Sequence, residues 1–199
     1  MSFYRFPFAS VVKGWSKKAS KIRWAIKANR IITHIKRFGK DSIETWKRFR
    51  EIFIPLEKSI DFYLFQLPPS IKPDHKKSIE EFMKLAKKEK GENIRFAIEF
   101  RNVKWFEEKE IEWAKKLGLV VVSVDAPRLP REIYKTDGII YLRMHGRSSW
   151  YSHDYTREEL KEVARNIINT NPKVVYIFFN NNHAMLKNAR EMMDLLRRV

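Results

Sequence analysis

The chain has 199 residues, of which 44% are hydrophobic, and it contains 6 Gly and 8 Pro. This composition is too apolar for a disordered, collagen-like or low-complexity chain, and the length suffices for one well-buried domain. The sequence contains no Cys, which excludes a disulfide framework, thiol catalysis and a thiolate metal site. Binding and catalysis must therefore rely on His, carboxylate, amide and cationic side chains.

The chain is strongly basic, with 41 Lys and Arg against 24 Asp and Glu, and a formal net charge of +17. A field of this size attracts nucleic acid at low salt and suggests a polyanion as partner. With 33% charged residues, the composition also fits a protein from a hot environment whose surface carries ion pairs. Both interpretations stay open.

The longest apolar runs, such as residues 119 to 124, are far shorter than the roughly 20 residues of a membrane-spanning helix. The N-terminus, MSFYRFPF, lacks the charged and then apolar order of a signal peptide. We therefore expect a cytoplasmic protein with no membrane partner.

Short runs rich in β-branched and aromatic residues alternate with longer amphipathic stretches, which predicts strands and helices in turn. The helix expected at 157 to 169 begins with the capping-box pair Thr156 and Glu159. This order indicates parallel strands joined by helical crossovers, in one α/β domain spanning residues 1 to 199. In chain order the elements are a strand at 22 to 29, a helix at 41 to 54, a strand at 62 to 68, a helix at 76 to 90, a strand at 94 to 101, a helix at 107 to 117, strands at 119 to 125 and 139 to 146, a helix at 157 to 169, a strand at 174 to 181 and a helix at 184 to 198.

Polar residues gather late in each predicted strand. Ligands bind at the carboxyl ends of parallel strands, where successive loops converge, so we expect these side chains to share a pocket. The alternatives are that each one merely ends a strand at the surface, or that a pair such as Glu99 and Arg101 fills a layer of a barrel. The late polar residues are Lys27, Gln66, Glu99, Arg101, Asp125, Arg143, His145, Asn180 and Asn181.

Seven segments, in the same order, resemble the YecE-like proteins, domain-of-unknown-function family 72. The resemblance runs nearly end to end and implies a TIM-type (β/α) barrel of eight strands. The segments are SFYRFP at 2 to 7, AIKANRIITHIKR at 25 to 37, LFQLPPS at 64 to 70, FAIEFRNVKWF at 96 to 106, VDAPR at 124 to 128, YLRMHGR with WYSHDYT at 141 to 156, and FFNNNHA at 178 to 184.

The resemblance also implies that the first strand and most of the second are missing, because Met1 stands about where the family's second strand ends. We expect an incomplete barrel of six strands, whose open edges invite self-association. A start site assigned too late is the favoured explanation, and translation of the upstream DNA tests it. A degenerate, inactive fragment and repair by self-association are the alternatives.

An enzyme is the first functional hypothesis, although neither the residues nor the resemblance specify a reaction. Glu99, Asp125 and His145 are the catalytic candidates, as acid, base or metal ligands. The cations Arg101 and Arg143 should keep the two carboxylates ionised. We expect a small ligand with a phosphate or carboxylate group, held by Lys27, His34, Gln66, Arg101, Arg143, Tyr151, Asn180 and Asn181.

No metal site is favoured, because three cations would repel a divalent ion and no short His motif is present. A divalent metal remains a weaker alternative, and the cofactor is unknown. His34 is expected in a loop, either at the pocket mouth or in solvent. Trp150, Tyr151 and Tyr155 would form an aromatic lid, or simply pack.

A nucleic-acid-binding or nucleic-acid-processing protein is the second hypothesis, and it depends on the basic surplus. Cations crowd the early segment, although such runs are commonly a solvated helix face. No helix-turn-helix, zinc-finger or RNP signature accompanies them. These cations are Lys13, Lys17, Lys18, Lys21 and Arg23.

Overall fold

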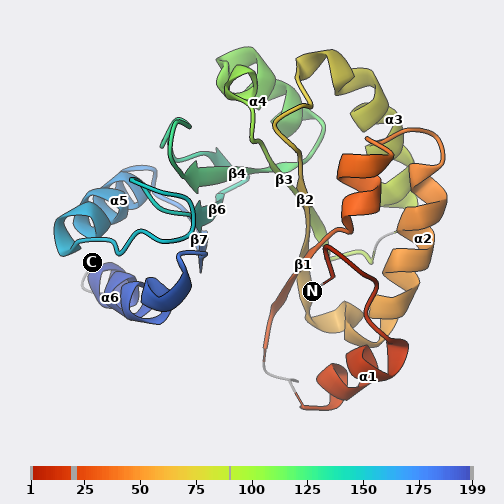
Figure 1. Ribbon diagram of the computed structural model, residues 1–199, viewed down its shortest axis with the longest axis horizontal. Coiled ribbons are helices and arrows are strands. Elements are labelled where there is room, and N and C mark those ends of the chain that lie inside the picture. Colours follow the sequence, from red (N-terminus) through yellow and green to blue (C-terminus); the bar gives the residue numbers. More distant parts are fainter. Residues whose placement is uncertain (1, 19–21, 90, 198–199) are drawn as a thin grey trace. The chain divides into compact units, whose positions relative to one another are not determined.

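The structure is a computed structural model that describes residues 2–18, 22–89 and 91–197 (Figure 1). Met1, the basic residue Lys21 and the predicted helix ends at Lys90 and Arg198 lie outside the described residues. The chain forms two compact units, Met1–Leu119 and Val120–Val199.

The first unit contains three strands that pair in parallel, with β2 between β1 and β3. In this register Lys27 lies opposite Leu64, and Gln66 lies opposite Glu99. The strands alternate with helices, as parallel pairing requires a crossover between one strand and the next. The elements are α1 (Ala9–Lys18), β1 (Trp24–Lys27), α2 (Ser42–Phe53), β2 (Ile60–Gln66), α3 (Lys76–Ala86), β3 (Arg95–Glu99) and α4 (Glu108–Lys116).

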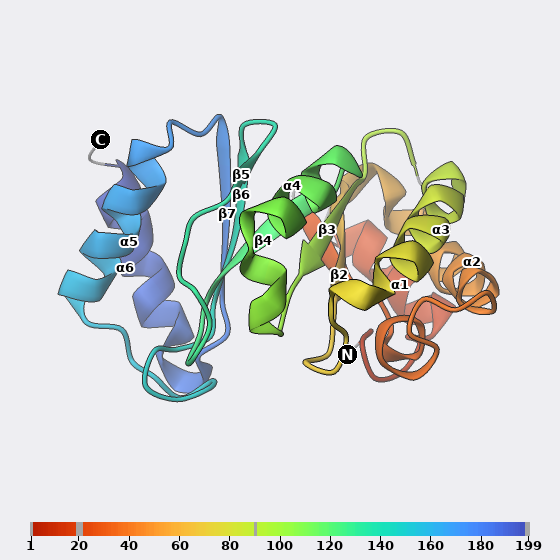
Figure 2. The same ribbon diagram turned by 90° about the horizontal axis from the view of Figure 1, so that it is seen from above.

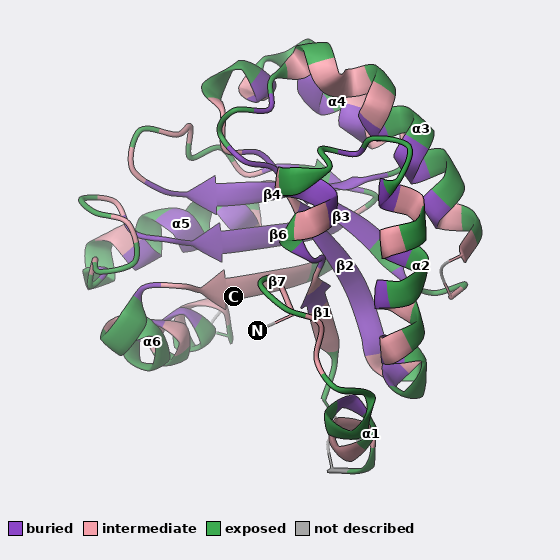
Figure 3. Cartoon of the chain, turned by 45° about the vertical axis from the view of Figure 1, so that its right-hand side comes forward, coloured by how far each residue is buried: buried purple, intermediate pink, exposed green. Residues whose placement is uncertain are grey.

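Aromatic side chains form the core of the first unit. Trp46 of α2 lies edge-on to Tyr63 of β2, with ring centroids 4.8 Å apart, and 5.4 Å from both Phe65 and Phe96. Figure 3 shows β2 buried along most of its length, and α2 and α3 with buried and exposed residues on different sides. Burial of these large rings stabilises the strands whose carboxyl ends carry the polar residues.

The second unit has β6 at its centre, parallel to β4 and β7 and antiparallel to the short β5. Helices α5 and α6 lie side by side (Figure 2) and share one buried apolar cluster with β6. Ile140 and Leu142 enter this cluster from β6, Leu160 from α5 and Met192 from α6. The elements are β4 (Val120–Asp125), β5 (Lys135–Thr136), β6 (Ile139–Met144), α5 (Arg157–Asn169), β7 (Val174–Phe179) and α6 (Met185–Arg197).

The predicted elements are confirmed. All six predicted strands are present, and the five predicted helices lie within a few residues of their expected ends. Helix α1 and strand β5 were not predicted, since α1 has Lys13 and Lys17 among its apolar residues and β5 has two residues. The parallel pairing and the alternation with helices confirm the α/β fold and agree with a TIM-type barrel that has fewer than eight strands. One domain over residues 1 to 199 stays a prediction.

None of the described helices combines the length and the apolar character needed to cross a membrane.

Candidate functional site

Three of the predicted site residues lie together at the carboxyl ends of β1, β2 and β3. Lys27 ends β1, Gln66 ends β2 and Glu99 ends β3. The Lys27 Nζ donates a hydrogen bond to Gln66 Oε1 at 2.6 Å, and Gln66 is the register partner of Glu99. Parallel strands bring their carboxyl ends to the same edge, which places these side chains next to one another.

A buried ion pair joins Glu99 and Arg101. Arg101 Nε donates to Glu99 Oε1 at 2.6 Å, and a second guanidinium nitrogen lies 2.5 Å from the same oxygen. Glu99 is fully buried, and 7% of the Arg101 side chain is exposed. Since buried charges are normally paired, the ion pair alone does not distinguish a ligand site from a structural layer.

His34 lies in a short π-helix, Ile31–Ile35, rather than in the loop that the sequence predicted. Its Nδ1 is 2.7 Å from Thr33 Oγ1, and the Phe3 ring packs edge-on against it at 5.0 Å. Burial, and then the charges of Lys27, Arg30 and Arg101, lower the pKa of His34 to about 4. The imidazole is therefore neutral at neutral pH, and its surroundings are cationic.

The first residues of the chain also line this site, which the sequence did not predict. Ser2 Oγ donates to the backbone oxygen of Lys27 at 2.9 Å, and the Lys27 Nζ lies 3.7 Å from the Phe3 ring centroid. Asn29 Nδ2 donates to the Ser2 backbone oxygen at 2.9 Å. In the sequence, the SFYRFP segment is notable for its resemblance to the family. Its contacts with Lys27 and Asn29 cannot be deduced from the spacing of residues.

In the second unit, Arg143 and Asn180 lie together at the ends of β6 and β7. An Arg143 guanidinium nitrogen donates to Asn180 Oδ1 at 2.9 Å. His145, two residues after Arg143, is fully buried. The ring centroids of Trp150 and Tyr151 each lie 5.5 Å from the centroid of the His145 imidazole. These two aromatic residues therefore contact a predicted catalytic residue, while Tyr151 remains 44% exposed.

The Asn181 side chain connects two segments of the second unit through hydrogen bonds. Its Nδ2 donates to the His153 backbone oxygen at 2.8 Å and to Asn188 Oδ1 at 2.6 Å. The side chain is buried, and it ties the loop before α5 to α6. Its predicted role in substrate binding remains a prediction.

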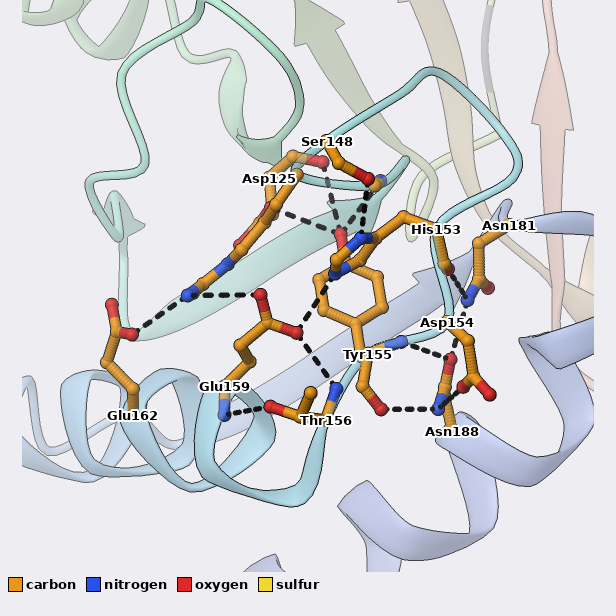
Figure 4. Close-up of polar contacts among 12 residues, drawn as sticks. Asp125, Ser148, His153, Asp154, Tyr155, Thr156, Glu159, Glu162, Asn181 and Asn188 are labelled. Atoms are coloured by element: carbon orange, nitrogen blue, oxygen red, sulfur yellow. Dashed lines mark hydrogen bonds and ion pairs between the residues drawn. The ribbon is translucent and has the colours of Figure 1, made fainter.

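Asp125 is buried and held by two side chains from the segment that follows β6 (Figure 4). Arg147 Nε donates to Asp125 Oδ2 at 3.0 Å, and the Tyr155 hydroxyl donates to Asp125 Oδ1 at 3.1 Å. Arg147 also donates to Glu162 of α5 at 2.9 Å. From the sequence alone, Arg101 and Arg143 are the cations expected beside the carboxylates, and Arg147 is not among the candidates.

Tyr155 is a core residue, so the expectation that it forms part of a lid is wrong. It is 1% exposed, and its hydroxyl accepts a hydrogen bond from the Gly146 backbone N–H at 2.8 Å. Burial, and then the charge of Asp125, raise the pKa of Tyr155 well above its ordinary value. The neutral phenol can therefore donate to Asp125 throughout the physiological pH range.

The residues of the predicted ring are divided between the two units. The first unit holds Lys27, Gln66, Glu99 and Arg101, and the second holds Asp125, Arg143, His145 and Asn180. A pocket shared by all eight residues stays a prediction. Over the described part of the chain, no group of three or more His, Asp or Glu side chains is placed to hold a metal ion.

Comparison with known proteins relates the whole chain to one family. The family model for "Protein of unknown function DUF72" matches residues 1–199. A solved DUF72 family protein from Thermotoga maritima has a TM-score of 0.81 and 25% identity, and the match covers 99% of this chain and 82% of that chain. No curated protein matches the chain.

A methyltransferase from Methanosarcina mazei is also similar, with a TM-score of 0.58 and 9% identity. The match covers 96% of this chain and 63% of the methyltransferase. Identity this low shows a likeness of fold alone.

Proposed function

Since this chain belongs to DUF72, a family of unknown function, we propose from the geometry of its first unit that it is an enzyme acting on a small anionic substrate. The substrate would bind through a phosphate or carboxylate group at the carboxyl ends of β1, β2 and β3. The observation that carries this proposal is the gathering of Lys27, Gln66 and the Glu99–Arg101 pair at that edge. Arg and Lys are the usual partners of phosphate and carboxylate groups.

The electrostatics of this edge favour an anion. Burial, and then the charges of the three cations Lys27, Arg30 and Arg101, lower the pKa of His34 and keep it neutral. Glu99 offsets one of these charges through its pair with Arg101. A neutral imidazole beside a cationic edge can form hydrogen bonds with a ligand without adding to the charge.

Glu99 would then act as a proton acceptor. A carboxylate bonded to a guanidinium favours its ionised form, which suits proton abstraction rather than proton donation. Asp125 and His145 of the second unit remain the other catalytic candidates.

The test is titration of the purified protein with inorganic phosphate and pyrophosphate by calorimetry. We expect saturable binding, weakened about tenfold or more in Lys27→Met and in Arg101→Gln, because each change removes a hydrogen bond to a charged group worth roughly 1.5–3 kcal/mol. Lys27→Met is the cleaner variant, since it leaves the buried Glu99–Arg101 pair intact.

Arg95→Gln is the matched control, because Arg95 is exposed and lies at the amino end of β3, away from the carboxyl end where Glu99 lies. Binding by this variant should equal that of the wild type. Equal binding by Lys27→Met and wild type, or an equal loss in Arg95→Gln, would contradict the proposal.

A further inference from the structure

A serine, a histidine and a glutamate form a hydrogen-bonded relay in the second unit (Figure 4). Ser148 Oγ lies 2.9 Å from His153 Nδ1, and His153 Nε2 lies 2.9 Å from Glu159 Oε2. Ser148 and His153 belong to the loop between β6 and α5, and Glu159 is in the first turn of α5. Nothing in the proposed anion site of the first unit uses these residues.

The direction of each hydrogen bond follows from the chemistry of Glu159. An ionised carboxylate can only accept, so a neutral His153 donates to it from Nε2 and keeps a lone pair on Nδ1. Burial raises the pKa of Glu159, but hydrogen bonds from Thr156 and His153 and the charge of Arg147 outweigh this effect and lower it overall. Nδ1 is thus placed to accept the proton of the Ser148 hydroxyl.

Contacts outside the relay hold its members in position. Glu159 is fixed by a capping box, in which Thr156 N donates to its Oε2 at 2.8 Å and its own N donates to Thr156 Oγ1 at 3.2 Å. The Tyr155 ring packs edge-on against the His153 imidazole at 4.7 Å, and Asn181 anchors the His153 backbone oxygen. A nucleophile and its base need this kind of support to keep a reactive geometry.

The tight loop depends on a glycine. Gly146 has φ of +113°, and a Cβ at this position would lie 2.3 Å from the Ser149 backbone oxygen. The loop therefore folds back closely after β6, which brings Ser148 to His153. Ser148 is exposed to solvent, whereas the His153 side chain is only 14% exposed.

From this geometry we propose that Ser148 is an activated nucleophile that hydrolyses esters of small carboxylic acids, with His153 as general base and Glu159 as a positioning residue. A hydroxyl bonded to an imidazole whose other nitrogen is held by a carboxylate is the arrangement that activates serine nucleophiles. The activity is additional to the anion site of the first unit and does not depend on it.

The reaction has two steps, acylation of Ser148 and hydrolysis of the resulting acyl-enzyme. Ser148 Oγ forms a bond to the carbonyl carbon while the ester C–O bond breaks, and His153 transfers the serine proton to the departing alcohol. Water then adds to the acyl carbon with His153 as base, and the carboxylic acid leaves as the proton returns to Ser148. Glu159 stabilises the imidazolium that forms in each step.

The full chain is tested with a fluorescent fluorophosphonate, whose phosphorus bonds to the serine oxygen as fluoride leaves, and with p-nitrophenyl acetate. We expect labelling at Ser148, identified by peptide mass spectrometry, and its complete loss in Ser148→Ala. His153→Ala should slow labelling and ester hydrolysis about 100-fold or more, the usual contribution of a positioned base.

Ser149→Ala and Ser152→Ala are the matched controls, because these hydroxyls lie in the same loop and contact each other at 2.7 Å. Both variants should be labelled at the wild-type rate. Labelling of Ser149 or Ser152 at the rate of Ser148, or no labelling of Ser148 beyond that of the urea-unfolded chain, would overturn the proposal.

Glu159→Gln separates positioning from folding, since Gln can still complete a capping box. We expect this variant to keep the wild-type melting temperature while the midpoint of its pH–rate profile moves to lower pH, because the imidazolium loses its carboxylate. An unchanged profile and rate in Glu159→Gln would show that Glu159 only caps α5 and that the relay does not operate.

Discussion

His34 shows how a single residue reports the electrostatics of the first unit. It lies in the short helix Ile31–Ile35 that comes after β1, and burial together with Lys27, Arg30 and Arg101 lowers its pKa to about 4. A histidine in solvent has an ordinary value near 6.5. The difference makes His34 a sensitive probe of whether the cations keep their places when a ligand binds.

The first prediction is that the His34 imidazole titrates with a midpoint near pH 4 in the folded protein. As the pH is lowered, the histidine of the unfolded chain binds its proton near pH 6.5, before that of the folded chain does. The free energy of unfolding should therefore decrease as the pH falls from about 6.5 to about 4. NMR titration of the ring protons measures the midpoint, and urea denaturation at several pH values measures the stability.

His34→Gln serves as the reference for both measurements. It identifies the ring signal, and its stability should depend less on pH over the same interval because the titrating group is gone. A midpoint between 6 and 7 in the wild type would show that burial and the three cations do not lower the pKa of His34 as described.

Several elements of the second unit are joined through Arg147. The guanidinium contacts Asp125 at the end of β4 and Glu162 in α5, and the loop that carries it also supplies Tyr155 to the same carboxylate. Asp125 is 2% exposed. Loss of one member of a buried ion pair leaves an uncompensated charge, which costs far more than loss of an exposed pair.

The second prediction is that Arg147→Met lowers the free energy of unfolding by about 3–5 kcal/mol. Arg147→Lys should restore part of the loss, because the charge returns without the second donor to Glu162. Urea denaturation followed by circular dichroism measures all three proteins.

Lys109→Met is the comparison at an exposed pair, since Lys109 and Glu107 are both largely exposed and in contact at 2.8 Å. This variant should show no measurable loss of stability, because solvent screens such pairs. A similar small effect for Arg147→Met would mean that Asp125 finds another partner.

The net charge of +17 is a property of the whole molecule. It acts at long range, unlike the short contacts of the first unit, and it attracts any polyanion without reading its sequence. Nucleic-acid binding therefore remains the alternative function, and its salt dependence separates it from the binding of a small anion.

The third prediction concerns this alternative. If nucleic acid is a partner, a labelled 20-base-pair DNA and a single-stranded RNA should bind at about 50 mM salt, with an affinity that falls linearly with salt on logarithmic axes. Fluorescence polarisation measures it, and Lys27→Met should bind like the wild type. Absence of binding below about 50 mM salt excludes this function.

The kind and order of the elements were predictable because hydrophobic periodicity is a local property. Helix α5 begins and ends at the predicted residues, since its capping pair and apolar stripe are written in consecutive positions. Helix α1 was missed because its packing, with Val12 buried and Trp15 stacked on Trp24, joins residues of different elements, which no local pattern reveals.

Part of the candidate site was predictable by the same reasoning. Lys27, Gln66 and Glu99 were expected together because residues at the ends of adjacent parallel strands share an edge, whatever the loops do. Arg147, Ser148 and His153 lie in a loop, where the side-chain direction does not follow strand parity.

The sequence by itself therefore determined the α/β class, the strand and helix order, the family resemblance and the polar strand ends. Only the tertiary structure decided which polar groups bond to one another: the Arg147 guanidinium with the Asp125 carboxylate, the Ser148 hydroxyl with the His153 imidazole, and the Ser2 hydroxyl with the backbone oxygen of Lys27. The physical reason is that periodicity places a residue on a face, whereas hydrogen bonds depend on loop conformation and on contacts between residues far apart in the chain.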